Sequence, residues 1–409
     1  MEMEIKLRRI FTVFLFFAFL FSFLGMHPSL ADDILEEPFT GVLPSSGTAL
    51  PTAKKPAVDA GAAIVMDVKS GRILYEKNSR TRRSIASTTK IMTAILAIEN
   101  GNLEDTVTIS KKAAAIGGST IGLKTGQTFT LNELLYGLML NSGNDAAIAI
   151  AEHIGGSVEG FADRMNAKAA ELGVTDTNYI TPHGLDRDGQ YSSAFDLATI
   201  TRYALENPVF CKIVSTHTAS IPIKHLHNTN EMLDLYPGAD GVKTGYTGQA
   251  GRCLVTSATR GGMRLISVVL NCPSRAKRAQ SSKSVLDYAF TNYKPHTLVE
   301  EKEHVKDIPV IKGMSPNISL CASTGIEMPM SQDEINSVEK VLELPDILPA
   351  PIKKGTEVGM VKFLINGEIF GSVPVETSVD IAKKGIWNYL GEIFQGCHRI
   401  MTGGLGTAQ

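Results

Sequence analysis

The sequence predicts a mixed α/β domain that is followed by a small all-β domain and a terminal amphipathic helix. Strand patterns at both ends of residues 58–292 surround a helical middle, which favours an antiparallel sheet packed against helices. Short β-like runs separated by Pro and Gly fill residues 293–378. Apolar residues then recur at helical spacing over residues 379–402.

Two segments precede the first domain. A short basic stretch and an apolar run over residues 10–24 lead to an expected cleavage site after Ala31, so residues 1–31 predict a secretory signal peptide. The apolar run is shorter than the roughly 20 residues that cross a membrane, and an uncleaved anchor is the alternative. Residues 32–57 are rich in Asp, Glu, Pro, Gly and Ser without periodicity, and we expect a flexible tether there.

The α/β domain contains strand signals at its ends and helix signals between them. In chain order, these are a hairpin over 62–68 and 72–75, helices over 88–99, 134–140 and 146–153, a second hairpin over 253–258 and 265–270, and a closing helix over 279–290. The helix over 88–99 is apolar on every side, which is typical of a helix inside a core. Thr130 and Glu133 have the spacing of a capping box ahead of the next helix.

The C-terminal part changes character twice. The β-like runs of the second domain cover 297–299, 308–311, 318–322, 341–344, 358–364 and 368–373. In the last segment Ile386, Leu390, Ile393 and Cys397 follow steps of four, three and four, and the only Trp, Trp387, widens the same stripe. The segment has too many polar residues for a membrane span and predicts a helix that lies in a membrane surface. A helix docked on the protein itself is the alternative.

The composition excludes several classes of partner. The chain holds 40 Lys+Arg and 42 Asp+Glu among 409 residues, which gives a formal net charge of −2. Because no basic excess is available to neutralise phosphates, we expect no nucleic-acid partner. The five Cys lie far apart without a Cys-x-x-Cys pair, which argues against a zinc ribbon and a disulfide framework. We expect neither a metal nor a cofactor.

The first of three chemical motifs is Ser87-Thr88-Thr89-Lys90. Its hydroxyl and amine stand three residues apart, so they share one face if a helix begins at Ser87. A serine hydroxyl becomes a nucleophile when a neighbour takes its proton. A lysine in an apolar surround near a second cation has a lowered pKa and can be that neighbour. The motif is weak alone, because a helix start with an exposed lysine has the same letters.

The other two motifs are Ser142-Gly143-Asn144 and Lys243-Thr244-Gly245. The former stands between two helix patterns, where a turn presents a hydroxyl and an amide together; an ordinary turn is the alternative. The latter precedes an apolar hairpin, where its cation and hydroxyl suit a substrate carboxylate and Gly245 lets another backbone approach closely. A second Lys-Thr-Gly at 124–126 shows no strand pattern after it, and we interpret it as a loop.

The order of the motifs is more specific than any one of them. SxxK, SDN and KTG together form the serine acyl-transfer set of penicillin-binding proteins and class A β-lactamases, and Gly143 replaces the central Asp here. From about Val58 to the C-terminus the chain resembles the low-molecular-mass penicillin-binding proteins, the serine D-alanyl-D-alanine carboxypeptidases of the S11 peptidase family. The matching segments are 86–93, 141–146, 183–186, 191–197 and 240–247. The resemblance implies a penicilloyl-serine transferase/β-lactamase-like fold for the first domain.

The resemblance also implies catalytic roles for five residues. Ser87 would attack the carbonyl between the two terminal D-alanines, and Lys90 would act as general base. Ser142 would relay the proton to the leaving D-alanine, and Lys243 would lower the cost of that step electrostatically. Asn144 would hold the Lys90 amine and the substrate amide.

Substrate-binding roles follow in the same way. Thr244 and Arg278 would hold the terminal carboxylate of the substrate. The backbone N–H groups of Ser87 and Tyr246 would stabilise the oxyanion, and Gly245 would give the substrate backbone room to approach. Tyr246 stands where the family has His, which changes a side chain but not a backbone N–H.

The implied partners are peptidoglycan stem peptides, β-lactams as covalent inhibitors, and the outer face of the cytoplasmic membrane through the C-terminal helix. We therefore expect an exported protein that is peripherally bound to the cell membrane. A β-lactamase is one alternative, although no Glu-x-x-x-Asn that could activate the deacylating water follows Ser142 at a suitable place. A non-catalytic cell-wall binding or scaffold protein is the other, and endopeptidase action on cross-bridges stays open.

Overall fold

The computed structural model describes residues 55–403, with side-chain exposure given as far as residue 398. The predicted signal peptide and nearly all of the predicted tether therefore lie outside the described residues.

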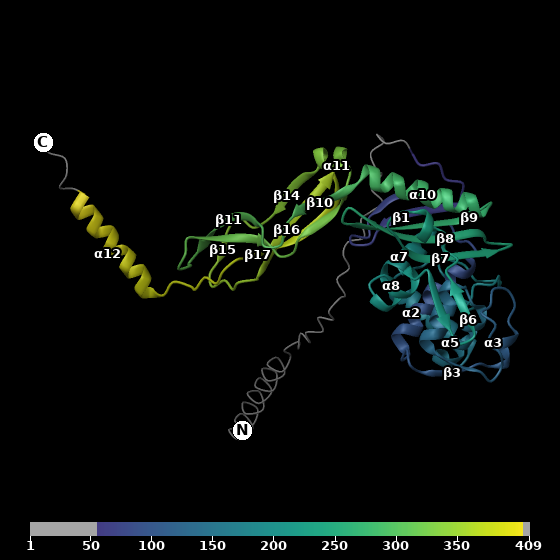
Figure 1. Ribbon diagram of the computed structural model, residues 1–409. Helices are drawn as coiled ribbons and strands as arrows, with labels where there is room; N and C mark the ends of the chain where they lie inside the picture. Colours follow the sequence, from purple (N-terminus) through teal and green to yellow (C-terminus); the bar gives the residue numbers. More distant parts are fainter. Residues whose placement is uncertain (1–54, 404–409) are drawn as a thin grey trace, which may run out of the picture. The chain divides into compact units, whose positions relative to one another are not determined.

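The first domain is built on a five-stranded antiparallel sheet with the strand order β2-β1-β9-β8-β7 (Figure 1). Its strands are β1 (Ala62–Asp67), β2 (Ile73–Lys77), β7 (Ala239–Thr247), β8 (Gly251–Arg260) and β9 (Met263–Cys272). Both predicted hairpins are present, as β1–β2 and β8–β9. They come from opposite ends of the domain and join where β1 pairs with β9. This order leaves β7, the strand that carries Lys-Thr-Gly, at the edge of the sheet.

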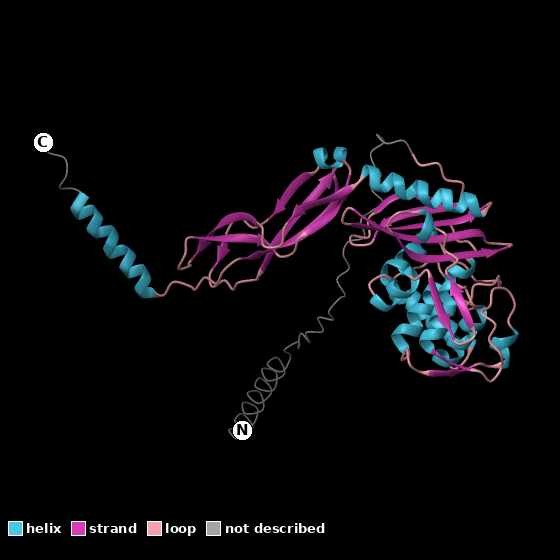
Figure 2. Cartoon of the chain, in the orientation of Figure 1, coloured by secondary structure: helices cyan, strands magenta, loops and turns pink. Residues whose placement is uncertain are grey.

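Both faces of the sheet are covered, as Figure 2 shows. Successive residues of a strand point to opposite faces, and along β1 Ile64 packs into one core while Val65 packs into the other. Helix α10 (Arg275–Asn292) lies along the second face, where its Leu286 is fully buried. Most of the remaining helices of the domain pack on the first face, whereas Met232 of α9 (Met232–Leu235) packs into the second core. The mixed α/β class predicted from the sequence is confirmed.

The helices and short strands between β2 and β7 make up the middle of the domain's sequence. They are η1 (Ala86–Thr89, a 3₁₀ turn), α2 (Lys90–Asn100), β3 (Thr106–Thr108), α3 (Lys111–Ala115), β4 (Thr128–Thr130), α4 (Leu131–Leu140), α5 (Asn144–Gly155), α6 (Val158–Glu171), α7 (Ala194–Ala204), α8 (Pro208–Ser215), β5 (Thr218–Ile221), β6 (Lys224–His227) and α9 (Met232–Leu235). The predicted capping box is formed: the Thr130 hydroxyl accepts from the Glu133 N–H, and the Glu133 carboxylate accepts from the Thr130 N–H.

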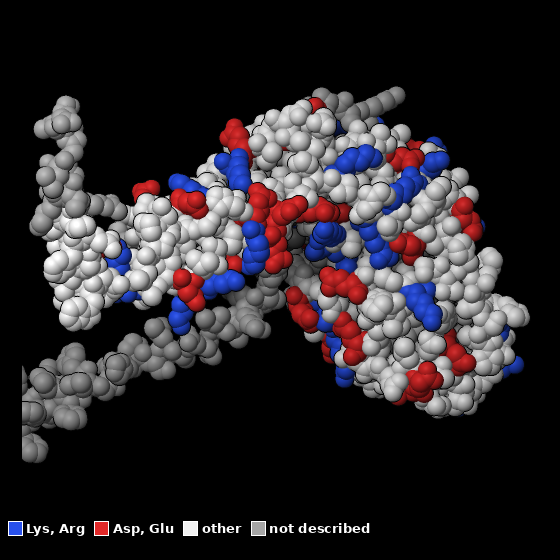
Figure 3. Space-filling model, turned by 60° about the vertical axis from the view of Figure 1, so that its left-hand side comes forward, with Lys and Arg blue, Asp and Glu red and all other residues white. Residues whose placement is uncertain are grey.

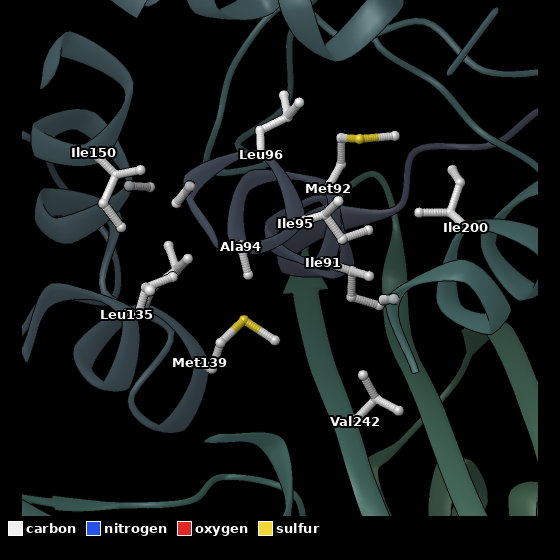
Figure 4. Packing of buried hydrophobic residues seen from close by; sticks show 14 of the residues in the cluster. Ile91, Met92, Ala94, Ile95, Leu96, Leu135, Met139, Ile150, Ile200 and Val242 are labelled. Carbon is white, nitrogen blue, oxygen red and sulfur yellow. The ribbon is translucent and has the colours of Figure 1, made fainter. Parts of the chain in front are cut away.

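Helix α2 is the centre of this core (Figure 4). Ile91 and Met92 are fully buried, in agreement with a sequence that is apolar on every side. Leu135 and Met139 of α4, Ile150 of α5, Ile200 of α7 and Val242 of β7 surround it. Truncating one of the buried aliphatic side chains to alanine would cost about 2–5 kcal/mol. Such packing fixes the start of α2, where the Ser-x-x-Lys motif lies.

The second domain is mainly β. A six-stranded sheet has the order β14-β16-β17-β12-β11-β15, and β10 pairs with β13. The strands are β10 (Lys294–Val299), β11 (His304–Ile311), β12 (Asn317–Ala322), β13 (Ile326–Met330), β14 (Glu339–Glu343), β15 (Leu348–Pro349), β16 (Glu357–Ile365) and β17 (Glu368–Thr377). One short helix, α11 (Gln332–Ser337), interrupts them. The sequence did not indicate this helix, although Ser331 and Glu334 form a second capping box at its start.

The terminal helix α12 (Ile386–Gly403) begins later than the boundary at residue 379 that the sequence predicted. The residues before it still belong to the β domain: Ile381 pairs with Ile352 and is 4% exposed, and Lys383 pairs with Gly313. Within residues 55–403, no helix is both long enough and apolar enough to cross a membrane. Charged side chains of both signs alternate over the face seen in Figure 3, which agrees with the absence of a basic excess.

Candidate active site

The Ser-x-x-Lys motif lies where the 3₁₀ turn η1 passes into α2. A 3₁₀ helix has three residues per turn, so positions three apart lie one above the other. Ser87 and Lys90 are therefore aligned, and the Lys90 Nζ to Ser87 Oγ distance is 2.9 Å. Ala86 before them has a φ of +48°, a left-handed conformation that ends the incoming segment sharply. The sequence foresaw this pairing on the condition that a helix begins at Ser87.

The Lys90 amine is surrounded by acceptors and shielded from water. In its charged form it donates to Ser87 Oγ at 2.9 Å, to Asn144 Oδ1 at 2.7 Å and to the His183 carbonyl at 2.7 Å. A neutral amine has two hydrogens; given to Asn144 and His183, they leave its lone pair facing the Ser87 hydroxyl. This is the geometry that a general base requires.

Burial lowers the pKa of Lys90 well below its usual range, and the nearby Lys243 ammonium lowers it further, while Asp145 acts in the opposite direction. Lys90 is 0% exposed, so its charged form lacks the solvation that water would give. A lowered pKa makes the neutral form of Lys90 easier to reach, and a neutral amine can accept the serine proton.

The turn between α4 and α5 carries the second motif. Ser142 has a φ of +60° and is 7% exposed, and Asn144 opens α5. The Asn144 side chain accepts from Lys90 through Oδ1 and donates through Nδ2 to the Gly117 carbonyl at 2.8 Å. Among the described residues, no hydrogen bond joins the Ser142 hydroxyl to Lys90 or to Lys243. The fold thus brings Asn144 into contact with Lys90, and Ser142 lies two residues before Asn144 on the same turn.

Asp145 is a residue of this site that the sequence reading missed. Its carboxylate is 1% exposed and accepts from the N–H groups of Ile121 at 3.1 Å, Gly122 at 2.9 Å and Leu123 at 3.0 Å. It therefore holds the loop before the second Lys-Thr-Gly, at 124–126, against the start of α5. The only signal in the sequence was an acid directly after the predicted site residue Asn144. No local pattern separates such an acid from one that caps a helix.

Lys243 of β7 enters the site from the sheet. Its side chain is 1% exposed and Nζ donates to the Thr244 carbonyl at 3.1 Å. Burial, together with the Arg278 charge, lowers the pKa of Lys243 to about 7. The Lys243 charge in turn lowers the pKa of Lys90. Lys90 and Lys243 are 153 residues apart in the sequence, and folding brings their motifs together.

Gly245 brings β7 against the nucleophile turn. A Cβ placed on Gly245 would lie 3.0 Å from the Ser87 nitrogen and 3.1 Å from the Ile85 carbonyl oxygen. Any side chain here would push strand and turn apart. The glycine permits a close backbone approach, and it sets the Ser87 and Tyr246 N–H groups near each other.

The structure also shows what surrounds the three predicted substrate-binding residues Thr244, Tyr246 and Arg278. The Thr244 hydroxyl lies 2.9 Å from the Thr229 hydroxyl. Tyr246 is 56% exposed, and the Arg252 guanidinium stacks 3.7 Å from its ring centroid. Arg278 is 4% exposed and its guanidinium donates to the Glu231 carboxylate at 2.6 Å. The sequence had not indicated a carboxylate partner for Arg278 within the chain.

His183 lies in a loop, and its backbone has a role at the site that the sequence did not indicate. It is 5% exposed, and its carbonyl is one of the acceptors of Lys90. Burial, with the Lys90 charge, lowers the pKa of His183 to about 3, so the ring stays neutral. Gly184 follows with a φ of +86°, and a Cβ there would lie 1.9 Å from the Ala86 carbonyl oxygen. This loop therefore fits directly beneath the nucleophile turn.

The second Lys-Thr-Gly, at 124–126, is an exposed loop, as expected. The expectation that no strand follows it was wrong, because β4 begins at Thr128. That strand pairs only with β3 in a two-stranded ribbon outside the main sheet. The false motif therefore lies away from the sheet edge that carries Lys243. Within residues 55–403, no group of His, Cys, Asp and Glu could hold a metal.

Comparisons with known proteins agree with this geometry. The sequence profile of a family described as D-alanyl-D-alanine carboxypeptidase matches residues 50–274, and a profile described as the C-terminal domain of penicillin-binding protein 5 matches residues 293–383. The chain is 38% identical over 345 residues to D-alanyl-D-alanine carboxypeptidase DacF of Bacillus subtilis, covering 82% of this chain and 89% of that one. It is 32% identical over 366 residues to DacC of Escherichia coli, covering 85% and 91%.

Solved structures give the same result. Penicillin binding protein 5 from Haemophilus influenzae superposes with a TM-score of 0.72 at 32% identity, over 81% of this chain and 100% of that chain. The DD-transpeptidase of Streptomyces K15 superposes with a TM-score of 0.57 at 36% identity, over 58% of this chain and 100% of that chain. With the carboxypeptidase profile matching more than half of its length, the chain belongs to the D-alanyl-D-alanine carboxypeptidase family of serine peptidases, S11.

Proposed function

We propose that this protein is a serine D-alanyl-D-alanine carboxypeptidase that removes the terminal D-alanine from peptidoglycan stem peptides through an acyl-enzyme on Ser87. The contact of the buried Lys90 amine with the Ser87 hydroxyl at 2.9 Å is the observation that carries this proposal. Membership of the S11 family supports the same reaction.

The chemistry follows from the five motif side chains. Lys90 takes the Ser87 proton as Oγ bonds to the carbonyl carbon of the penultimate D-alanine. When the C–N bond breaks, the proton passes through Ser142 to the leaving D-alanine nitrogen, with Lys243 stabilising the transfer. Asn144 keeps the Lys90 amine aimed at Ser87. Water, deprotonated by the same relay, then hydrolyses the ester.

Binding roles complete the proposal. Ser87 and Tyr246 would stabilise the oxyanion through their backbone N–H groups, which is typically the largest single term in such reactions. Thr244 would hold the substrate carboxylate. Arg278 would act on the same carboxylate, although its guanidinium is paired with Glu231 in this structure. We propose that Arg278 attracts this carboxylate through its positive charge, from a position behind Lys243 and Thr244.

Mass spectrometry tests the proposal. The protein is incubated with benzylpenicillin and, separately, with a pentapeptide stem, and D-alanine release is measured. A long-lived penicilloyl adduct on Ser87 together with D-alanine release is the expected result, and Ser87→Ala should lose both. Rapid turnover of penicillin would favour the β-lactamase alternative. An absence of adduct and product would favour a non-catalytic wall-binding protein.

A DD-transpeptidase is the second candidate, favoured by the superposition on the Streptomyces K15 enzyme. The same acyl-enzyme would then be attacked by an amine in place of water. Adding an amine acceptor such as glycylglycine to the stem-peptide reaction separates the two. Hydrolysed product alone supports a carboxypeptidase, while an acceptor adduct that forms in proportion to acceptor concentration supports a transpeptidase. Hydrolysis of a cross-linked dimer in the same assay would reveal endopeptidase activity.

We also propose that the chain is exported after cleavage behind Ala31 and that α12 binds the outer face of the cytoplasmic membrane. Apolar side chains recur along one stripe of α12 and are exposed: Ile386 72%, Trp387 81%, Ile393 61% and Phe394 74%. An exposed apolar stripe on an amphipathic helix is typical of a membrane-surface anchor. The proposed organisation is a catalytic domain over 58–292, a β domain that begins at 293 and includes Ile381 and Lys383, and an anchor helix that begins at Ile386.

Deletion of residues 386–409 tests the anchor. The deletion begins after Ile381, because Ile381 is buried in the β domain and its loss would damage that fold. The shortened protein should move from the membrane fraction to the soluble fraction while penicillin still acylates Ser87. Retention on the membrane would point to an uncut N-terminal segment instead.

A further inference from the structure

A cavity of about 460 Å³ opens beyond the end of β7, outside the motif residues. Three chain segments line it: residues 82–84 just before the nucleophile turn, residues 187–191 after His183, and Gln249 and Ala250 in the β7–β8 turn, with Asn271 at the end of β9. Asp186 joins two of these segments, because its carboxylate accepts from the Thr247 hydroxyl at 2.7 Å and from the Gln249 N–H at 3.4 Å. The cavity wall is therefore tied to the strand that carries Lys243.

The lining carries an excess of positive charge that the protein only partly neutralises. It contains Arg82, Arg83 and Arg187 against a single acid, Asp188. Arg82 is paired with Asp176 at 2.9 Å. Among the described residues, no carboxylate lies within ion-pair distance of Arg83 or Arg187. The Arg83 side chain donates through Nη2 to the Gly61 carbonyl at 3.2 Å, and its buried Nε has no hydrogen-bond partner in the described part of the chain.

The proposed binding roles give the direction in which a substrate would run. The terminal carboxylate lies at Thr244, and the reacting carbonyl lies at Tyr246. The acyl side of the peptide then continues past Thr247 towards the β7–β8 turn. Because β7 is an edge strand, an extended peptide can follow it in this direction. From Tyr246 to Gln249 is three residues, which is at most about 10 Å at roughly 3.3 Å per residue, because the chain turns after Thr247.

That span reaches the second residue of a peptidoglycan stem, counted from the sugar end. Upstream of the reacting D-alanine stand the diamino acid and then a γ-linked D-glutamate, whose α-carboxylate is either free or amidated. A free carboxylate would meet the two unpaired guanidinium groups, whereas a carboxamide would not.

We propose that this cavity is a subsite for the free α-carboxylate of the γ-linked D-glutamate, with Arg187 and Arg83 as its ligands. The inference rests on the proposed function, since the direction of the peptide comes from it. The subsite would make the enzyme discriminate between amidated and unamidated stems at a position remote from the bond that breaks. Hydrogen bonds to charged groups are worth enough to give about tenfold discrimination at an open site.

The test compares two pentapeptide stems that differ only at the second residue, γ-D-glutamate or its α-carboxamide. D-Alanine release by the full chain gives kcat/KM for each, and penicillin acylation of Ser87 is measured on the same samples. The wild-type protein should prefer the carboxylate by about tenfold, mainly through KM, because the contact is present in the ground state as well as the transition state. Arg187→Gln should bring the preference to within about twofold. Arg164→Gln, which removes an exposed cation from α6, should retain it.

Equal kcat/KM for the two peptides on wild-type protein that penicillin acylates would overturn the subsite and leave the proposed function standing. A tenfold preference that persists in Arg187→Gln would overturn the assignment to this cavity. The absence of both D-alanine release and a penicillin adduct would overturn the proposed function, and the subsite with it.

Discussion

Replacing Gly245 by alanine should slow acylation of Ser87 without preventing folding. The added Cβ would lie 3.0 Å from the Ser87 nitrogen and 3.1 Å from the Ile85 carbonyl oxygen, and ordinary contact begins at 3.4 Å. The strand and the nucleophile turn must therefore separate by about 0.4 Å, the difference between 3.4 and 3.0 Å. Gly245 is not in the left-handed region, so the alanine backbone itself is unstrained.

The magnitude follows from what the separation moves. The Ser87 N–H is one of the two proposed oxyanion donors, and Tyr246 next to Gly245 supplies the other. Losing one such donor costs about 10²–10³-fold in rate, so a partial displacement should cost about 10–100-fold in acylation. Overpacking of this kind costs about 1–3 kcal/mol of stability, which a folded domain of this size tolerates.

Stopped-flow acylation by a chromogenic β-lactam measures the rate, and thermal unfolding measures the stability. Gly248→Ala is the matched control: it lies on the same hairpin, has no left-handed φ, and its Cβ would meet nothing within 4 Å. Acylation of Gly245→Ala at the wild-type rate would refute the reasoning. An equal loss of rate in Gly248→Ala would also refute it, since the loss would then belong to the hairpin and not to the contact with Ser87.

Three further predictions concern the proton acceptor. Lys90→Met should abolish acylation at every pH, and partial activity at high pH by stopped flow would show that another base acts. Lys243→Gln should raise the pKa of Lys90, because Lys243 lowers it, and the acid limb of the acylation–pH profile should move to higher pH. Asp145→Asn should move that limb to lower pH, because Asp145 raises the same pKa; it should also loosen the 121–123 loop, seen as faster amide exchange there. If both substitutions moved the acid limb of the profile in the same direction, the electrostatic explanation would be contradicted.

Much of the first domain could be predicted because its signals are local. A capping box at Thr130 and Glu133 marks a helix start from two side chains, and a run that is apolar on every side marks α2 as buried. The motif order then connected residues from α2, α5 and β7. The fold brings Lys90 Nζ to within 2.7 Å of Asn144 Oδ1, and no periodic pattern in the sequence predicts that contact.

The features that the sequence did not indicate depend on tertiary contacts. Glu231 looked like any surface acid until the fold placed it against Arg278. The part that His183 plays belongs to its backbone carbonyl, which every residue type possesses. The start of α12 was placed too early because Ile381 has the same apolar character whether it faces a helix stripe or pairs with Ile352.

The depth of Lys90 in the domain has a consequence for the conditions under which the protein can work. Dissolved ions weaken attractions between exposed charges beyond about 8 Å at 0.15 M salt, but they act far less on groups that water cannot reach. Burial is the largest cause of the lowered pKa of Lys90; the Lys243 charge lowers it further, and Asp145 raises it. For a protein proposed to work outside the cell, the pKa of Lys90 should therefore change little with the external salt concentration. Salt would affect the access of the substrate rather than the activation of Ser87.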